Sequence, residues 1–144
     1  MTQQEVDYLL RLRKYKKNDE ITELPYSSGE KVIVPLVSDD QRESFDLIVR
    51  CGKIELQKYH FVNRANKYIC LVRLDLEPSV HINPDGQKID GPHMHIYTAE
   101  YGERMAMPLP TDLDCTNLQN VITFFMNRCN IVTPPNIRIT GLFQ

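Results

Sequence analysis

Several features that mark whole classes of protein are missing from this sequence. No stretch approaches the ~20 consecutive apolar residues of a membrane-spanning helix, and residues 1–5 lack the basic start and apolar run of a secretory signal peptide. No Gly-rich phosphate-binding motif and no G-x-S-x-G nucleophile elbow is present. We therefore expect a protein of the bacterial cytoplasm with no membrane partner, no bound nucleotide and no serine-hydrolase chemistry.

Paired cysteines are missing as well, and the spacing of the cysteines matches no common motif. The four cysteines are far apart, and none forms a C-x-x-C pair; they are Cys51, Cys70, Cys115 and Cys129. This spacing argues against the paired-cysteine zinc and redox motifs. In a reducing compartment we expect free thiols that behave as small buried hydrophobic side chains.

A surplus of either charge is also missing. The chain has 17 Lys and Arg against 19 Asp and Glu, a net charge of −2. A protein that coats nucleic acid should be clearly basic, and a DNA mimic should be strongly acidic. We therefore expect no direct nucleic-acid partner, although net charge leaves room for a local patch of either sign. The length of 144 residues, with 42% hydrophobic and 25% charged residues, predicts one domain over residues 1–144.

Two segments have the apolar spacing of helices. The first is predicted over residues 3–17, where Thr2-x-x-Glu5 forms a capping box and basic residues suit the final turn. The second follows Thr111-x-x-Asp114 and repeats apolar residues at helical intervals until Pro134-Pro135 ends it; these are Leu118, Val121, Ile122, Phe125 and Cys129.

Between the helices, short runs alternate apolar and polar residues as strands do. We predict strands at 31–37, 45–51, 54–62, 67–76, 93–98 and 104–109, and a short terminal strand around Ile137, Ile139 and Leu142. Residues 63–66 read as a hairpin loop and residues 83–86, Asn-Pro-Asp-Gly, as a turn. The predicted fold is α+β: one antiparallel, meander-like β-sheet with the N-terminal and the C-terminal helix packed on it.

Three histidines carry the chemistry of the sequence. His93 and His95 are two apart in a predicted strand, so both side chains leave the same face from Cα atoms roughly 6.5–7 Å apart. His81 precedes the 83–86 turn. A wide connection opposes His81 to His93, whereas a tight hairpin opposes it to Lys88, and the sequence does not choose between them.

The residue types of this cluster suit a metal ion. Neutral imidazole binds zinc, copper, nickel and iron, and three histidines with a fourth position for water, carboxylate or thiolate favour zinc. Of the available fourth ligands, which are Asp75, Asp85, Asp90 and the cysteines, we favour Asp75 because it ends the strand before His81. His60 joins only if its strand is adjacent. General acid–base catalysis without metal and a purely structural role stay open as alternatives.

Residues 47–110 contain short motifs whose types and order resemble those of a little-characterised family of Firmicutes and phage proteins. The motifs are V-R-C-G-K-I-E-L at 49–56, R-L-D-L at 73–76, N-P-D-G at 83–86 and P-H-x-H-x-Y at 92–97. In size and style the chain also resembles type II anti-CRISPR proteins of streptococcal phage, some of which contain zinc. That resemblance implies an inhibitor that binds an RNA-guided CRISPR nuclease and blocks DNA loading or cleavage, with a structural metal.

Two functions are therefore weighed against each other, and a domesticated regulator or antitoxin with an incidental histidine cluster stays open beside them. The first is a zinc-stabilised inhibitor of a type II CRISPR nuclease, which is not an enzyme and needs a closed metal site. The second is a metal-dependent hydrolase or RNA-cleaving toxin, which needs an open site that activates water. In the second, phosphate is held by basic residues, Arg73, Arg50, Lys53 or Lys58, and Tyr97 or Glu100 assists.

Overall fold

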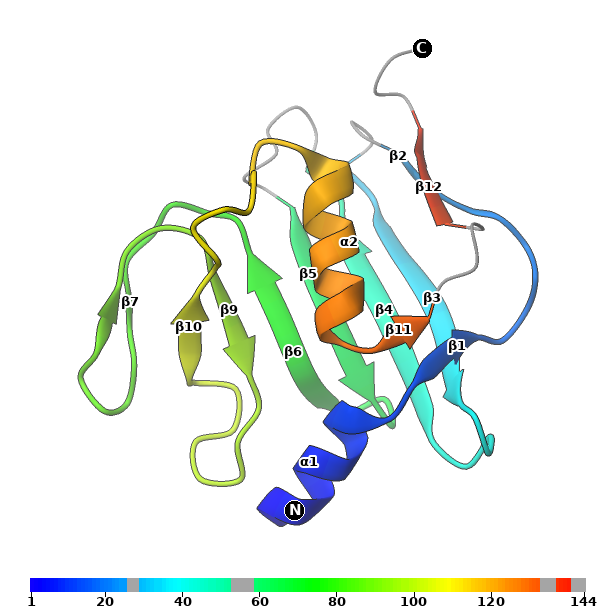
Figure 1. Cartoon of the computed structure of the whole chain (residues 1–144), viewed down its shortest axis with the longest axis horizontal. Coiled ribbons are helices and arrows are strands. Elements are labelled where there is room, and N and C mark those ends of the chain that lie inside the picture. The colour runs from blue at the N-terminus through cyan, green and yellow to red at the C-terminus, as the bar shows by residue number, and fades with distance from the viewer. Residues whose placement is uncertain (26–28, 53–58, 133–136, 141–144) are drawn as a thin grey trace.

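The computed structural model describes residues 1–25, 29–52, 59–132 and 137–140. Its centre is an eight-stranded, curled sheet (Figure 1). The spatial order of the strands is β10 (Ala106–Pro108), β9 (His93–Ile96), β6 (Ile69–Asp75), β5 (His60–Ala65), β4 (Ser44–Arg50), β3 (Lys31–Ser38), β1 (Lys14–Lys16) and β11 (Ile131–Val132). Neighbours are antiparallel except β1 and β11, which are parallel.

Two smaller strand pairs flank this sheet. β2 (Thr22–Pro25) pairs in parallel with β12 (Ile137–Thr140), and β7 (His81–Ile82) forms a hairpin with β8 (Lys88–Ile89). The β7–β8 hairpin projects beside β10 at one end of the molecule (Figure 1). The predicted α+β class, with a mostly antiparallel sheet and two helices, is confirmed.

The alternating pattern of the strands separates the two faces of the sheet. On β4, Phe45, Leu47 and Val49 are buried in the hydrophobic core, and Arg50 at the end of the strand is exposed. On β5, Phe61 enters the core and contacts Phe125 of α2, with ring centroids 5.8 Å apart. The neighbouring residue His60 therefore projects from the face opposite α2.

Helix α1 (Gln3–Arg11) starts where predicted but ends six residues early. Thr2 Oγ1 accepts a hydrogen bond from Glu5 N at 3.1 Å, as the capping box predicts. Leu12 is extended, and Lys14–Lys16 forms β1, so the prediction of helix to residue 17 is wrong. The reason is tertiary: Lys14 is fully buried, and its Nζ donates to the carbonyls of Leu12 at 2.9 Å and Cys129 at 2.8 Å.

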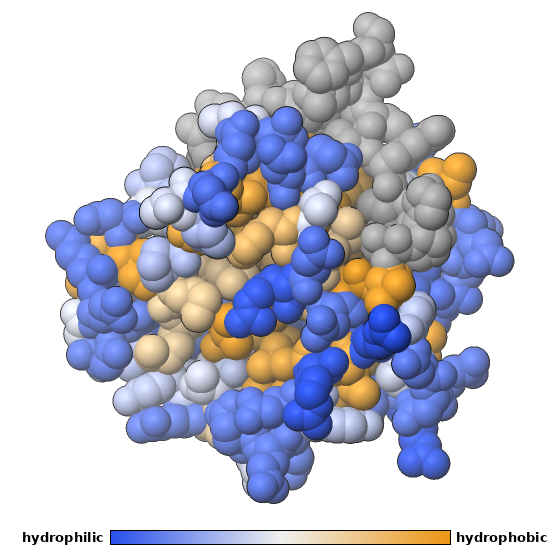
Figure 2. Space-filling model, viewed as in Figure 1, coloured by the Kyte–Doolittle hydropathy of each residue, from blue (hydrophilic) through white to orange (hydrophobic). Residues whose placement is uncertain are grey.

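Helix α2 (Leu118–Arg128) also differs from its predicted bounds. Its cap is Asn117, whose Oδ1 accepts from Asn120 N at 3.0 Å. Asp114 instead accepts from Thr116 N in a local turn, so the predicted cap at Thr111-x-x-Asp114 is wrong. The apolar side of α2 packs on the sheet, and its outer side shows hydrophilic residues with hydrophobic ones in the gaps around it (Figure 2).

The strand bounds agree with the sequence in part. The predicted loop at 63–66 is wrong: β5 continues to Ala65, and the turn uses Asn66 and Lys67 at φ 52° and 68°. Most of the predicted strand at 54–62 and the terminal Leu142 fall outside the described residues, and β12 covers Ile137–Thr140.

No disulfide joins any two cysteines within the described part of the chain. Neither described helix has the length and apolar character to cross a membrane.

Candidate metal centre

His93 and His95 lie on β9, and the strand period places both on the face opposite the core, as predicted. Met94, between them, is 2% exposed and belongs to the core. The register of β6 against β9 sets Asp75 opposite His93 and Arg73 opposite His95. Both histidines are buried, each 4% exposed, whereas His81 is partly exposed.

His81 reaches the same point from the β7–β8 hairpin. The Asn83–Gly86 turn is tight, with Gly86 at φ 91°, and it sets His81 opposite Ile89. Neither predicted register, opposite His93 or opposite Lys88, is therefore the pairing observed. His81 nevertheless meets the β9 pair because the hairpin lies beside β10, which pairs with β9 (Figure 1).

Asn83 is the residue that fixes this hairpin. Its Nδ2 donates to Ala106 O at 2.9 Å, and its Oδ1 accepts from Ala106 N at 2.8 Å, so the amide imitates a strand partner for β10. Asn83 is 2% exposed. Sequence reasoning treated Asn83 only as a turn residue, because nothing local signals a contact 23 residues away.

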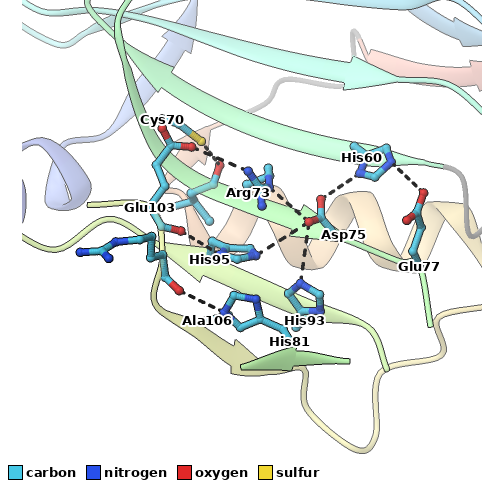
Figure 3. Close-up of polar contacts among 12 residues, drawn as sticks. His60, Cys70, Arg73, Asp75, Glu77, His81, His93, His95, Glu103 and Ala106 are labelled. Carbon is cyan, nitrogen blue, oxygen red and sulfur yellow. Dashed lines mark hydrogen bonds and ion pairs between the residues drawn. The ribbon is translucent and has the colours of Figure 1, made fainter. Parts of the chain in front are cut away.

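The three imidazoles face one another (Figure 3). Their ring centroids are 5.2 Å apart for His81 and His93, 4.8 Å for His81 and His95, and 4.9 Å for His93 and His95. One nitrogen from each ring lies within 4.8 Å of the other two. Such atoms sit within roughly 2.8 Å of a common centre, against a zinc–nitrogen bond of ~2.0–2.1 Å. Shifts of under about 1 Å would therefore bring all three to bonding distance.

Hydrogen bonds leave one lone pair on each ring. Nδ1 of His93 donates to Gly91 O at 3.0 Å, and Nδ1 of His95 donates to Glu103 O at 2.8 Å. Nε2 of His81 faces the oxygens of Asn83 Oδ1 and Arg104 O, each at 3.0 Å. Because carbonyl oxygens only accept, these nitrogens carry the protons, and the opposite nitrogen of each ring keeps its lone pair. Metal-binding histidines are typically oriented in this way.

His95 carries the clearest sign of a missing partner. Its Nε2 is buried and makes no hydrogen bond. Burial, together with the positive charge of Arg73, lowers the pKa of His95 to about 4, so the ring is neutral at pH 7. A buried polar atom with no partner is costly, and a bound cation would satisfy it.

Asp75, the predicted fourth ligand, lies beside the cluster. Its Oδ2 is 3.8 Å from Nε2 of both His93 and His95. The same Oδ2 accepts from Arg73 Nε at 3.2 Å, and Oδ1 accepts from His60 Nδ1 at 2.8 Å (Figure 3). Burial opposes the charge of Asp75, but the His60 bond and Arg73 outweigh it and hold its pKa below the usual value. Direct ligation by Asp75 stays a prediction.

The other candidate ligands stand apart from the three histidines. His60 lies on the strand adjacent to β6, but its partner is Asp75, and that hydrogen bond raises the pKa of His60. Asp85 accepts from Gln87 N inside the turn at 2.9 Å, and Asp90 is exposed. Burial raises the pKa of the Cys70 thiol to about 12.

The cluster forms one wall of a pocket of about 350 Å³. Sequence reasoning identified Arg73 here but missed Glu77 and Arg104, and it interpreted Glu103 as part of a solvated turn. Loops bring all three of these residues to the pocket. Glu100 and Tyr97 were expected to assist instead of Glu103. The lining residues are Arg73, Asp75, Glu77, Ser79, Val80, His81, His93, His95, Glu103 and Arg104.

Comparison with known proteins places the chain in a family without assigning a role. Residues 1–131 match the sequence profile of DUF6978, described as a family of unknown function, and the chain belongs to that family. No curated protein and no solved structure matches the chain.

Proposed function

We propose that this member of DUF6978 binds one divalent transition-metal ion through His81, His93 and His95 and uses it to hydrolyse a substrate held in the adjoining pocket. The observation that carries the proposal is that one ring nitrogen from each of these three histidines lies within 4.8 Å of the other two at the wall of that pocket. Zinc is the expected ion, because three neutral imidazoles and one open position are the donor set of many catalytic zinc sites.

The pocket supports hydrolysis better than a closed structural site. A bound zinc ion supplies a water whose pKa falls to about 7. Arg73 is held beside the cluster by Asp75 at 3.2 Å and by Glu103 at 3.7 Å, so its guanidinium is positioned to meet an anionic substrate. Glu77 and Glu103 line the same pocket and can accept protons.

A structural ion is the second candidate, and one observation favours it. His81 belongs to a hairpin outside the main sheet, whereas His93 and His95 belong to β9, so a shared ion would fasten the hairpin to the sheet. This is the role that the anti-CRISPR resemblance implies, with a type II CRISPR nuclease as protein partner. The inhibitor function and the cytoplasmic location both stay predictions.

Two assays separate the candidates. Zinc-loaded protein is incubated with bis(p-nitrophenyl) phosphate and p-nitrophenyl acetate, and in parallel is added to a type II CRISPR nuclease cleaving its DNA target. The hydrolase proposal predicts turnover that chelation abolishes, and its loss in His95→Gln with the circular dichroism spectrum unchanged. Zinc retention without turnover of either ester, together with inhibition of the nuclease, would replace the hydrolase by the inhibitor.

A further inference from the structure

One row of directly opposed residues crosses five strands on the sheet face opposite α2. The register pairs Lys31 on β3 with Arg50 on β4, Arg50 with His60 on β5, His60 with Asp75 on β6, and Asp75 with His93 on β9. Adjacent strands lie ~4.8 Å apart, so the row is roughly 19 Å long and ends at the histidine cluster. It therefore leads from basic residues to the proposed metal.

The basic end of the row lacks counter-charge from the residues that the structure describes. Like charges that face each other across two strands are destabilising, and Lys31 and Arg50 are such a pair. Within the described ranges no carboxylate forms an ion pair with either residue, and Asp75 is occupied by His60 and Arg73. Both cations are exposed. An external anion is the partner that this arrangement suits.

A second pocket lies where that anion would bind. It has a volume of about 380 Å³ and is lined by Arg50, His60, Val62, Arg73 and Asp75. Arg73 and Asp75 also line the pocket of the histidine cluster, so the two pockets share a wall on β6. His60 on β5 and His93 on β9 are two strand spacings apart, roughly 10 Å. Phosphates one or two nucleotides apart along an extended strand can span such a distance.

We propose that the substrate is a single-stranded polynucleotide, with one phosphate bound between Arg50 and Arg73 and a phosphodiester one or two nucleotides away at the histidine cluster. The inference rests on the proposed hydrolase function and names its substrate class. Guanidinium groups bind phosphate through paired N–H donors. The net charge of −2 argued against a nucleic-acid partner, but this row is a local patch that the total conceals.

The reaction is a hydrolysis with water as the co-reactant. The oxygen of water forms a bond to phosphorus, and the bond from phosphorus to one ester oxygen breaks. The departing oxygen takes a proton, and the water gives one up to a base or to solvent. The products are one strand with a terminal phosphate and one with a hydroxyl, with no change in oxidation state.

Binding and cleavage are tested separately with the full chain. Fluorescein-labelled single-stranded RNA, single-stranded DNA and duplex DNA of equal length are titrated by anisotropy, with the protein in EDTA so that the metal plays no part. Arg50→Gln should weaken single-strand binding about tenfold, the size of one charge-assisted hydrogen bond, and lower the salt slope by ~1. The matched control is Arg128→Gln, an exposed cation on α2, which should change neither.

The possible outcomes test the substrate assignment and the hydrolysis separately. Single-strand binding that depends on Arg50, followed by zinc-dependent cleavage of RNA or DNA, supports the inference, and the preferred strand identifies the sugar. Equal binding by Arg50→Gln and wild type, or binding to duplex alone, overturns the substrate assignment even if zinc and ester hydrolysis are found. Strand binding in EDTA, by a protein that also fails to take up zinc when zinc is supplied without EDTA, would support the phosphate surface and overturn the hydrolysis.

Discussion

The imidazole of His81 stacks on that of His93, with the ring planes 24° apart and the centroids 5.2 Å apart, although their strands do not pair with each other. The contact exists because the Asn83 amide fastens the β7–β8 hairpin to Ala106 of β10. The proposed metal site therefore assembles only when the hairpin packs against β10.

Replacing Asn83 should loosen both. Asn83→Ala removes two buried hydrogen bonds and leaves both backbone groups of Ala106 without that partner, which should cost about 2–3 kcal/mol of unfolding free energy. Because His81 would lose its position, zinc affinity should fall about 10–100-fold. Urea denaturation and competition with a zinc chelator measure the two effects. Asp85→Ala, in the same turn but exposed, is the control, and an equal loss there would show that Asn83 has no special role.

Lys14 should make stability depend on alkaline pH. Its Nζ lies at the ends of both helices, donating to Leu10, Leu12 and Cys129 carbonyls. Burial lowers the pKa of Lys14 to about 8 from 10.5. The unfolded chain therefore binds more protons between those values, and the contribution of Lys14 to stability rises as pH increases from about 8 to 10.5.

Comparison with Lys14→Met isolates this effect from other groups that titrate in the same range. The difference in unfolding free energy between wild type and variant, measured by urea denaturation at pH 8 and pH 10.5, should shift in favour of wild type at the higher pH. A constant difference, or a shift the other way, would show that the folded and unfolded chains hold this proton equally.

Asp75→Asn asks whether the carboxylate is a ligand. If water fills the fourth position, the variant should retain zinc with affinity reduced no more than about tenfold, because only a neighbouring group has changed. The pKa of His60 should fall, since its hydrogen-bonded anion is gone, and NMR titration of the His60 ring measures that shift. A loss of zinc as complete as in a His93 variant would make Asp75 the fourth ligand.

Breaking the buried ion pair between Asp46 and Arg64 should strongly lower the free energy of unfolding. Asp46 is 1% exposed, and its carboxylate accepts from Arg64 Nη2 at 2.8 Å and Nε at 3.2 Å. Asp46→Ala strips a half-buried guanidinium of its partner and should cost about 3–5 kcal/mol in unfolding free energy. Asp40→Ala removes an exposed carboxylate 4.0 Å from Arg42 and serves as the reference, with under about 1 kcal/mol expected from that pair.

Local patterns predicted the parts of this protein that local forces control. The period of two placed His93 and His95 on one face and Met94 in the core, and the capping box placed the start of α1. The end of α1 could not be read, because the basic residue that suits a final helical turn, Lys14, is buried in a strand against Cys129. That contact joins residues 115 apart.

The same distinction applies to the site. The types of residue in the cluster indicated a metal, but the position of His81 depends on Asn83 meeting Ala106, which no short motif encodes. Likewise, the second pocket needs the registers of β4, β5 and β6 together to bring Arg50, His60 and Arg73 to one face. The sequence named Arg50 and Arg73 as phosphate ligands without showing that they are neighbours.

Metal analysis of the purified protein tests the central claim most directly. Protein exposed to zinc, passed through gel filtration and analysed by plasma mass spectrometry should carry one equivalent. The His93→Ala His95→Ala double variant should carry none, and His60→Ala, which removes the one histidine outside the cluster, should keep its equivalent. Wild-type protein that emerges without zinc, or a double variant that still holds it, would contradict the account.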